Sequence, residues 1–184
     1  MRHETEGVMF AVGDKVVHNE YGICRITEIS TRQFPGQDKK DYYEMVPLAD
    51  DGYGTTFYTA VDHGGKLRPP MTQEQILDMI DSMPTIEPLM IASTGNRMVD
   101  MENVKNAYNS LMRSGNPSDW VQLLRTIYRK GKQLSAQRKR ITEFEAHARD
   151  NSERLLYGEI AGVMEIPVHS VEKFITERIE TKES

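Results

Sequence analysis

The sequence contains a single cysteine and no long apolar run, and each shortage excludes a class of structure. Cys24 is the only cysteine among 184 residues, so no disulfide can form within the chain, and we expect Cys24 to be a small buried apolar residue. No apolar stretch approaches the roughly 20 residues that a membrane-spanning helix needs. No signal peptide precedes the first predicted strand, so the expected location is the cytoplasm, with no membrane partner. A content of 38% hydrophobic and 28% charged residues is ordinary for a protein of one or two domains.

Patterns that would indicate an enzyme or a bound metal are also lacking. None of the five histidines lies within helical reach of another or pairs with the cysteine, so neither a zinc site nor a catalytic dyad is expected. The glycines mark turns and lack the spacing of a phosphate-binding loop. We therefore expect no enzyme, no cofactor, no metal and no small-molecule substrate. Four glutamates on predicted helices are interpreted as solvated side chains that pair with nearby arginines. They are Glu143, Glu145, Glu153 and Glu159.

Short strands without helical periodicity between them fill residues 9–70. Phe10 to Ile29 is predicted to form strand, turn and strand, because β-branched residues stand on both sides of a turn at residues 19–22. Tyr42 to Leu48 and Thr55 to Val61 are predicted as two further strands. Close spacing of such strands is typical of a small SH3-like or Tudor-like β-barrel.

Beyond Pro69 and Pro70 the spacing at which apolar residues recur changes from every two residues, typical of strands, to every 3.6 residues, typical of helices. Thr72 and Gln75 have the spacing of a capping box, and Asn116 and Pro117 have the form of a helix start. Further helices are predicted over residues 99–112, 120–131 and 166–179, and residues 134–162 are predicted to form either one long helix or two. The predicted class is thus α+β by segregated domains: a disordered extension at 1–8, a barrel at 9–70 and an all-α helical bundle at 71–184.

Several runs of residues resemble one known family. The run V-G-D-K-V-V-H-N-E-Y-G-I-C-R-I at residues 12–26 resembles the opening of the CarD/CdnL family of bacterial transcription regulators. It is also similar to the RNA-polymerase-interacting module of transcription-repair coupling factor. R-T-I-Y-R-K at 125–130, Q-L-S-A-Q-R-K-R at 133–140 and L-L-Y-G-E-I-A at 155–161 resemble the helical domain of CarD. The resemblance recurs from Phe10 to about Ile175, which is nearly the whole chain.

The resemblance implies a partner for the barrel. In similar proteins the barrel docks on the β subunit of RNA polymerase by laying an exposed strand beside a strand of the polymerase. Carried over by position, the contacts would come from Arg32, Thr56, Phe57 and Tyr58. The family often has an arginine where this chain has Tyr58. Tyrosine keeps the packing and one hydrogen bond but has no charge.

One stretch of the predicted helices reverses the acidic balance of the chain. The net charge is −5, yet the segment from Trp120 to Thr142 contains seven basic residues and no acidic one. These residues are Arg125, Arg129, Lys130, Lys132, Arg138, Lys139 and Arg140. Such a run is either a solvated face or a surface that contacts the phosphates of duplex DNA without sequence specificity.

The family also implies a residue that wedges into promoter DNA. In some relatives a tryptophan at a helix start enters the minor groove at the upstream edge of the promoter bubble. The matching position, near residues 96–99, has no tryptophan here. Arg97 and Met98 are the candidates for such a wedge, since methionine can insert between base steps and arginine can read a narrow minor groove. Trp120, the only tryptophan, is predicted to pack in the core with Leu123, Leu124 and Ile127.

The sequence and the resemblance together predict a transcription regulator. Its partners would be the RNA polymerase β subunit and promoter DNA, bound non-specifically, and its effect would be on the stability of the open complex. Two alternatives stay open. One is a protein-only adaptor that bridges RNA polymerase and another partner without binding DNA. The other is an enzyme of unrecognised type.

Overall fold

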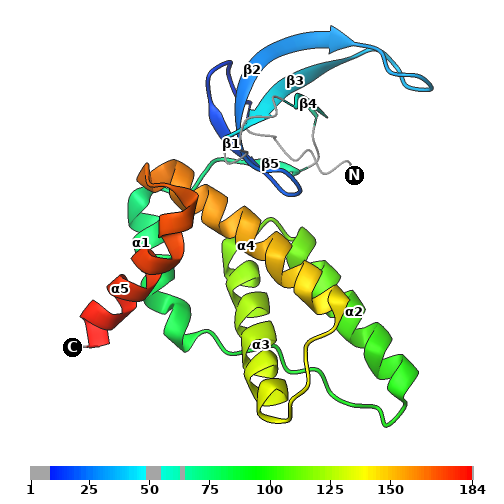
Figure 1. Cartoon of the computed structure of the whole chain (residues 1–184). Helices are drawn as coiled ribbons and strands as arrows, with labels where there is room; N and C mark the ends of the chain where they lie inside the picture. Colours follow the sequence, from blue (N-terminus) through cyan, green and yellow to red (C-terminus); the bar gives the residue numbers. More distant parts are fainter. Residues whose placement is uncertain (1–8, 49–54, 63–64, 184) are drawn as a thin grey trace, which may run out of the picture.

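The computed structural model describes residues 9–48, 55–62 and 65–183, and it consists of an N-terminal antiparallel sheet followed by helices (Figure 1). The strands are β1 (Lys15–His18), β2 (Gly22–Arg32), β3 (Lys40–Pro47), β4 (Phe57–Ala60) and β5 (Leu67–Arg68). The α-helices are α1 (Gln73–Ser82), α2 (Arg97–Arg113), α3 (Pro117–Ala136), α4 (Glu143–Met164) and α5 (Val171–Glu183). Two short 3-10 turns are η1 (Met83–Thr85) and η2 (Val168–Ser170). The predicted α+β class, with the strands before the helices, is confirmed. The predicted extension at 1–8 lies outside the described residues.

The sheet has the strand order β4-β3-β2-β1-β5, and every neighbouring pair is antiparallel. β1 and β2 form the predicted hairpin, in which Val16 pairs with Cys24 and Gly22 adopts a φ of 77° at the turn. Such a φ is accessible to glycine without strain. The register of β2 against β3 shifts between Ile26 and Glu28. An irregularity of this kind bends a strand, which agrees with the curvature of β2 in Figure 1.

The predicted closed barrel is not confirmed. β4 and β5 form the two edges of the sheet, and among the described residues they do not pair with each other. β5 contains only two residues and β4 only four. Strands this short offer few backbone groups to close a barrel, so the observed element is an open, curved sheet.

Helix starts agree closely with the sequence signals. The Thr72 side chain accepts from the backbone N–H of Gln75, and the Gln75 side chain accepts from the N–H of Thr72, which is the predicted capping box. Asn116 caps α3, with Pro117 at its first position. α2 begins after Asn96, whose side chain accepts from two backbone N–H groups.

The structure decides between the alternatives left open for residues 134–162. Leu134 belongs to α3, which continues past Gly131 and ends at Ala136. Arg138 then takes the left-handed region with a φ of 58°, and a second capping box, formed by Thr142 and Glu145, starts α4. Residues 134–136 are therefore the end of α3, and one further helix, α4, covers residues 143–162. The predicted helix end at Gly131 was wrong, since the break lies in the loop at 137–142.

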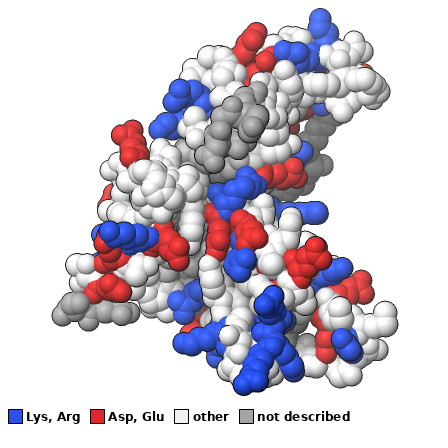
Figure 2. Space-filling view, viewed as in Figure 1, with Lys and Arg blue, Asp and Glu red and all other residues white. Residues whose placement is uncertain are grey.

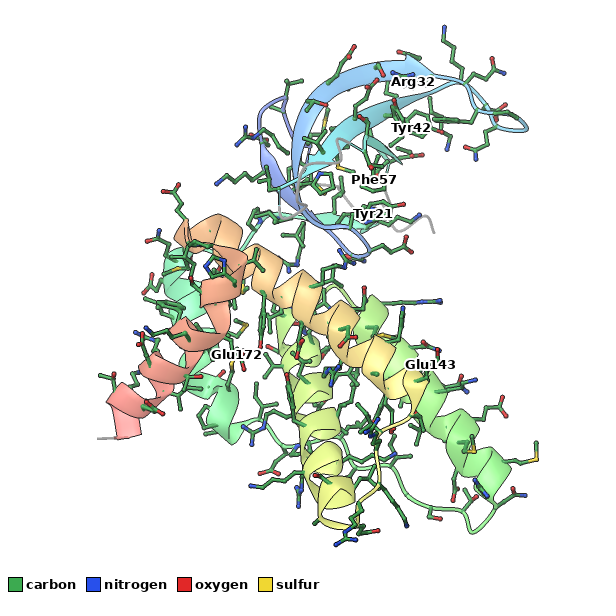
Figure 3. All side chains as sticks on the ribbon, in the orientation of Figure 1. Tyr21, Arg32, Tyr42, Phe57, Glu143 and Glu172 are labelled. Atoms are coloured by element: carbon green, nitrogen blue, oxygen red, sulfur yellow. The ribbon has the colours of Figure 1, made fainter. Side chains whose placement is uncertain are left out.

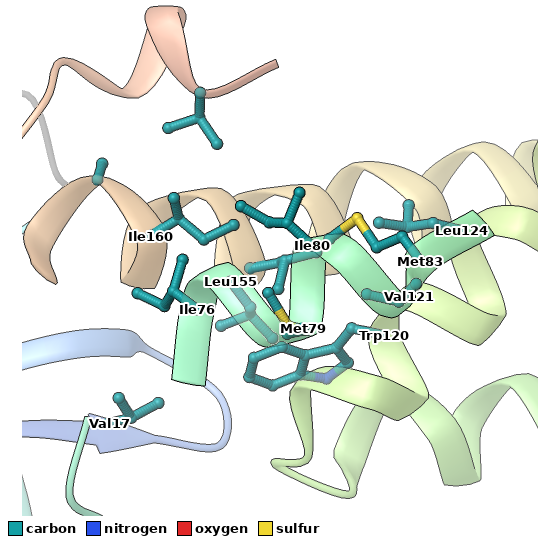
Figure 4. Packing of buried hydrophobic residues seen from close by; sticks show 13 residues of the cluster. Val17, Ile76, Met79, Ile80, Met83, Trp120, Val121, Leu124, Leu155 and Ile160 are labelled. Atoms are coloured by element: carbon teal, nitrogen blue, oxygen red, sulfur yellow. The ribbon is translucent and has the colours of Figure 1, made fainter. Parts of the chain in front are cut away.

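Buried apolar side chains join the sheet to the helices (Figure 4). Val17 of β1 lies in one cluster with side chains of α1, α3, α4 and α5. Trp120 has no exposed surface in this cluster, and its indole N–H donates to the carbonyl of Met112 at 3.2 Å. The prediction that Trp120 packs in the core is confirmed, as is the burial of Cys24. Burial raises the pKa of the Cys24 thiol to about 12, so the group is protonated at neutral pH.

The sheet lies directly against α4. Gly162 leaves room for Ile23, since a Cβ at residue 162 would lie 2.7 Å from the Ile23 Cδ1 atom. Lys15 donates to the carbonyl of Gly162 at 3.1 Å, and Arg154 donates to the carbonyl of Glu20 at 2.8 Å. These contacts fix the sheet on the helical layer.

Two of the glutamates interpreted as solvated are buried, and that interpretation was wrong for them. Glu145 is 2% exposed and pairs with Lys130. Glu159 has no exposed surface and accepts from both terminal nitrogens of Arg68, at 2.7 and 2.6 Å, and from the N–H of Met71 at 2.9 Å. Helical spacing cannot reveal such partners, because they lie on other elements of the fold. Glu143, labelled in Figure 3, is exposed.

Candidate functional site

β4 forms one edge of the sheet, and its residues carry the first candidate surface. β4 pairs with β3 along one side, and no described strand pairs with its other side. Thr56 precedes the strand and is exposed, and Tyr58 is 38% exposed. An unpaired edge presents backbone N–H and C=O groups that a strand of another protein can bind.

The structure brings Arg32 of β2 and Tyr58 of β4 together. The guanidinium carbon of Arg32 lies 4.6 Å from the centre of the Tyr58 ring, a cation–π distance. Glu44 of β3 stands between their strands and accepts from Arg32 Nε at 2.9 Å and from Ser30 at 2.6 Å. Hydrogen bonds from Ser30 and then Arg32 hold the pKa of the Glu44 carboxyl below its usual range. Arg32 is therefore anchored but still partly exposed beside the free edge.

Phe57 has a different environment from its neighbour Tyr58. Its ring stacks on Tyr21 with centres 3.7 Å apart, and Tyr21 stacks in turn on His18 at 4.5 Å. In Figure 3 the labelled Tyr21 and Phe57 lie nearer to the helices than Arg32, which is toward the far end of β2. Phe57 thus contributes to the packing of the sheet, while Tyr58 and Arg32 contact each other and remain partly exposed.

Comparison with known protein families gives a match for the segment that forms this sheet. Residues 10–71 match the family described as the CarD-like/TRCF RID domain. The match thus supports a module of the CarD-like/TRCF RID type in the sheet. The match includes all five strands and the candidate residues at the β4 edge. A RID domain indicates interaction with RNA polymerase in transcription. Comparison of the whole chain with curated proteins gave no significant match.

Sequence reasoning missed some residues of the RID surface. Glu44 orients Arg32, and Phe34 packs edge-on against both Tyr42 and Tyr58, at 5.0 and 5.9 Å between ring centres. A charged residue within an otherwise apolar strand, such as Glu44 in Tyr42 to Leu48, was a signal that could have indicated a paired carboxylate.

The seven basic residues of the segment from Trp120 to Thr142, which are predicted to contact DNA, separate into two groups. Five of them are exposed, and no described carboxylate lies within ion-pair distance of any of the five. Figure 2 shows a concentration of Lys and Arg at the lower end of the molecule, where α3 ends in Figure 1. We call these five the basic surface. It consists of Arg129, Lys132, Arg138, Lys139 and Arg140.

The other two basic residues make contacts inside the protein. Arg125 is half-buried and donates to the carbonyl of Met83 at 2.6 Å. Lys130 pairs with the buried carboxylate of Glu145. Burial raises the pKa of Glu145, but hydrogen bonds from Lys130 and Thr142 outweigh burial, and the net pKa is below the ordinary value. Lys130 and Arg125 therefore hold helices in place, which leaves them less available to DNA than the other five.

Arg97 and Met98, the candidates for a wedge, form the first turn of α2. Met98 is 81% exposed, and Arg97 is also exposed. The loop before them is fixed by Asp100, which accepts from Ser93 and Thr94. The first turn of a capped helix therefore presents one exposed apolar side chain and one exposed cationic side chain.

The described part of the chain contains no group of three or more His, Cys, Asp or Glu side chains placed to hold a metal ion. Among the described helices, none has the length and apolar character needed to span a membrane.

Proposed function

We propose that this protein is a non-enzymatic transcription regulator that binds the β subunit of RNA polymerase through the β4 edge and contacts promoter DNA through its helices. The observation that carries the proposal is the RID domain with a free edge strand beside an anchored arginine and an exposed tyrosine. A strand of the β subunit would extend the sheet at β4, and Arg32 and Tyr58 would contact it from the adjoining face.

The basic surface supports the second half of the proposal. Its cations have no carboxylate partner in the described chain, and their binding to phosphates would release condensed counterions from DNA. Contacts between these cations and phosphates carry no sequence information, so this binding would be non-specific, with Arg97 and Met98 placed to enter the minor groove. Tethering by the polymerase would raise the effective concentration of DNA and stabilise the open complex.

Polymerase binding is tested at the β4 edge. Tyr58→Asp places a charge where we expect packing, and Arg32→Gln removes the cation but keeps a polar side chain. Each should weaken binding to the isolated β subunit by about thirtyfold, which corresponds to the roughly 2 kcal/mol of an interface hot spot. Titration calorimetry measures the affinity, and circular dichroism confirms the fold. Arg25→Gln, an exposed change on the same strand β2, is the matched control and should bind normally. Unchanged affinity in both folded variants contradicts docking at this edge.

DNA binding is tested by replacing the five residues of the basic surface with glutamine. The slope of log affinity against log salt should fall by about one unit for each cation that binds a phosphate in the wild type, equally for unrelated DNA sequences. The variant should still bind polymerase, yet fail to stabilise the open promoter complex when polymerase is saturated with it. Lys173→Gln, on the exposed face of α5, is the control. Equal promoter opening by the wild type and the five-residue variant would favour the protein-only adaptor.

A further inference from the structure

A groove between α3 and α4 combines positive charge with an apolar floor. Its volume is about 750 Å³, and it lies between the C-terminal half of α3, the loop at 137–142 and the first half of α4. The cations Lys132, Lys139, Arg140 and Arg149 line it, and its lining includes no acidic side chain. Three of these cations belong to the basic surface, so the groove is part of the same positively charged end of the molecule.

The loop that bears two of the cations is fixed by backbone hydrogen bonds. The N–H of Arg138 donates to the carbonyl of Ser135, and the N–H of Lys139 donates to the carbonyl of Leu134 at 2.8 Å. Arg149, on the opposite wall, pairs with the exposed carboxylate of Asp150 at 2.7 Å. Cationic side chains therefore stand on both walls of the groove, and the one on α4, Arg149, is oriented by Asp150, which offsets part of its charge.

The floor of the groove contains an exposed aromatic ring. Tyr128 is 51% exposed, although it lies in the middle of α3, and Ile127 and Ile141 line the groove beside it. Its hydroxyl donates to Glu153 of α4, which holds the ring in one orientation. Gly131 keeps the floor open, since the nearest atom to a Cβ at that residue would be a methyl of Ile141 at 3.7 Å.

Binding to the phosphates of a duplex would explain the cations that line the groove, but it would not explain the apolar and aromatic side chains of its floor. A duplex keeps its bases stacked inside and presents phosphates on a convex surface, so it cannot fill an apolar groove between two helices. An unpaired strand presents phosphates together with unstacked bases, and single-strand-binding proteins combine cations along the backbone with aromatic side chains on which bases stack. Tyr128 between two cationic walls has this combination.

We propose that the groove between α3 and α4 binds single-stranded DNA, with a base stacked on Tyr128 and the neighbouring phosphates bound by Lys132, Lys139, Arg140 and Arg149. The inference rests on the proposed function, because an unpaired strand at the promoter arises only on opening of the duplex. The protein would then stabilise the open complex by holding a separated strand as well as by binding the duplex.

The test compares a fluorescent single strand of about 12 nucleotides with a duplex of the same sequence, both titrated with the full chain at low salt. We expect tighter binding to the single strand. Tyr128→Ala should weaken single-strand binding about tenfold, the scale of one base–aromatic stack, and change duplex binding less than about twofold. Tyr128→Phe keeps the ring but loses its hydrogen bond to Glu153, so it should bind the single strand more tightly than Tyr128→Ala and close to the wild type. Thermal unfolding of each variant confirms that it is folded.

A second variant tests the groove without touching the ring or the cations. Gly131→Leu should fill the floor next to Ile141 and reduce single-strand affinity alone. Equal affinity for the two DNA forms, or equal losses for both in Tyr128→Ala, overturns the inference and leaves duplex binding standing. Binding to neither form overturns the inference together with the proposed DNA binding. Tighter binding of a peptide of alternating glutamate and phenylalanine, in competition with the strand, would assign the groove to a protein partner instead.

Discussion

Arg68→Ala is expected to lower the free energy of unfolding by about 3–5 kcal/mol, because it leaves the carboxylate of Glu159 without a charged partner in the interior. Glu159 has no exposed surface, and the side chain of Arg68 is 26% exposed. The guanidinium also donates to the carbonyl of Gly115 at 2.8 Å and lies 5.9 Å from the centre of the Trp120 ring. Urea unfolding followed by circular dichroism measures the loss.

Two comparisons isolate the cause of that loss. Lys173→Ala breaks the exposed pair with Glu177 on α5, and it should cost no more than about 0.5 kcal/mol. Combining Arg68→Met with Glu159→Leu removes both charges and replaces them with apolar volume, so it should restore much of the stability that Arg68→Ala removes. A loss in Arg68→Ala no larger than that in Lys173→Ala would refute the view that this pair is a main connection between sheet and helices.

The Arg68–Glu159 pair also bears on the proposed function. Arg68 is in β5, the last strand of the RID domain, and Glu159 is in α4, which runs beneath the sheet. Together with the hydrogen bonds from Lys15 and Arg154, the pair fixes the β4 edge relative to the basic surface. A protein that binds polymerase with one end and DNA with the other needs this fixed geometry to direct the second interaction.

Structural features that depend on residues close together in the chain could be predicted from the sequence. The capping box at Thr72, the start of α3 at Asn116 and the β1–β2 hairpin all depend on residues close together in the chain, so their signals are local. The boundary between α3 and α4 was equally local. Thr142 and Glu145 have the spacing of a capping box, and that signal would have separated the two helices.

Features that depend on distant partners could not be predicted in the same way. Glu159 and Arg68 are 91 residues apart in the chain, and Glu145 and Lys130 are 15 apart on different helices. The helical pattern around these glutamates is that of a solvated face, and only the fold shows that their partners permit burial. The same holds for the candidate site: the resemblance indicated Arg32 and Tyr58 separately, but the interaction between them depends on the register of three strands.

Trp120→Ala is expected to cost about 3–5 kcal/mol of stability, because it removes a large fully buried side chain and leaves a cavity between α1, α3 and α4. Figure 4 shows the indole among Ile76, Met79 and Leu155. The melting temperature should fall by about 6–20 °C for a chain of this size. The substitution also removes the indole N–H that donates to the carbonyl of Met112. Scanning calorimetry measures the fall in melting temperature.

Trp120→Phe separates a core role from a role in DNA binding. Phenylalanine keeps most of the apolar volume, so this variant should lose less stability than Trp120→Ala and remain folded at 25 °C. Its affinity for duplex DNA and its effect on promoter opening should equal those of the wild type, since a side chain without exposed surface cannot enter a minor groove. Met98→Ala, at the exposed start of α2, should show the opposite pattern, with normal stability and weaker promoter opening. A fully stable Trp120→Phe protein that no longer supports promoter opening would assign the wedge to Trp120 and remove it from Met98.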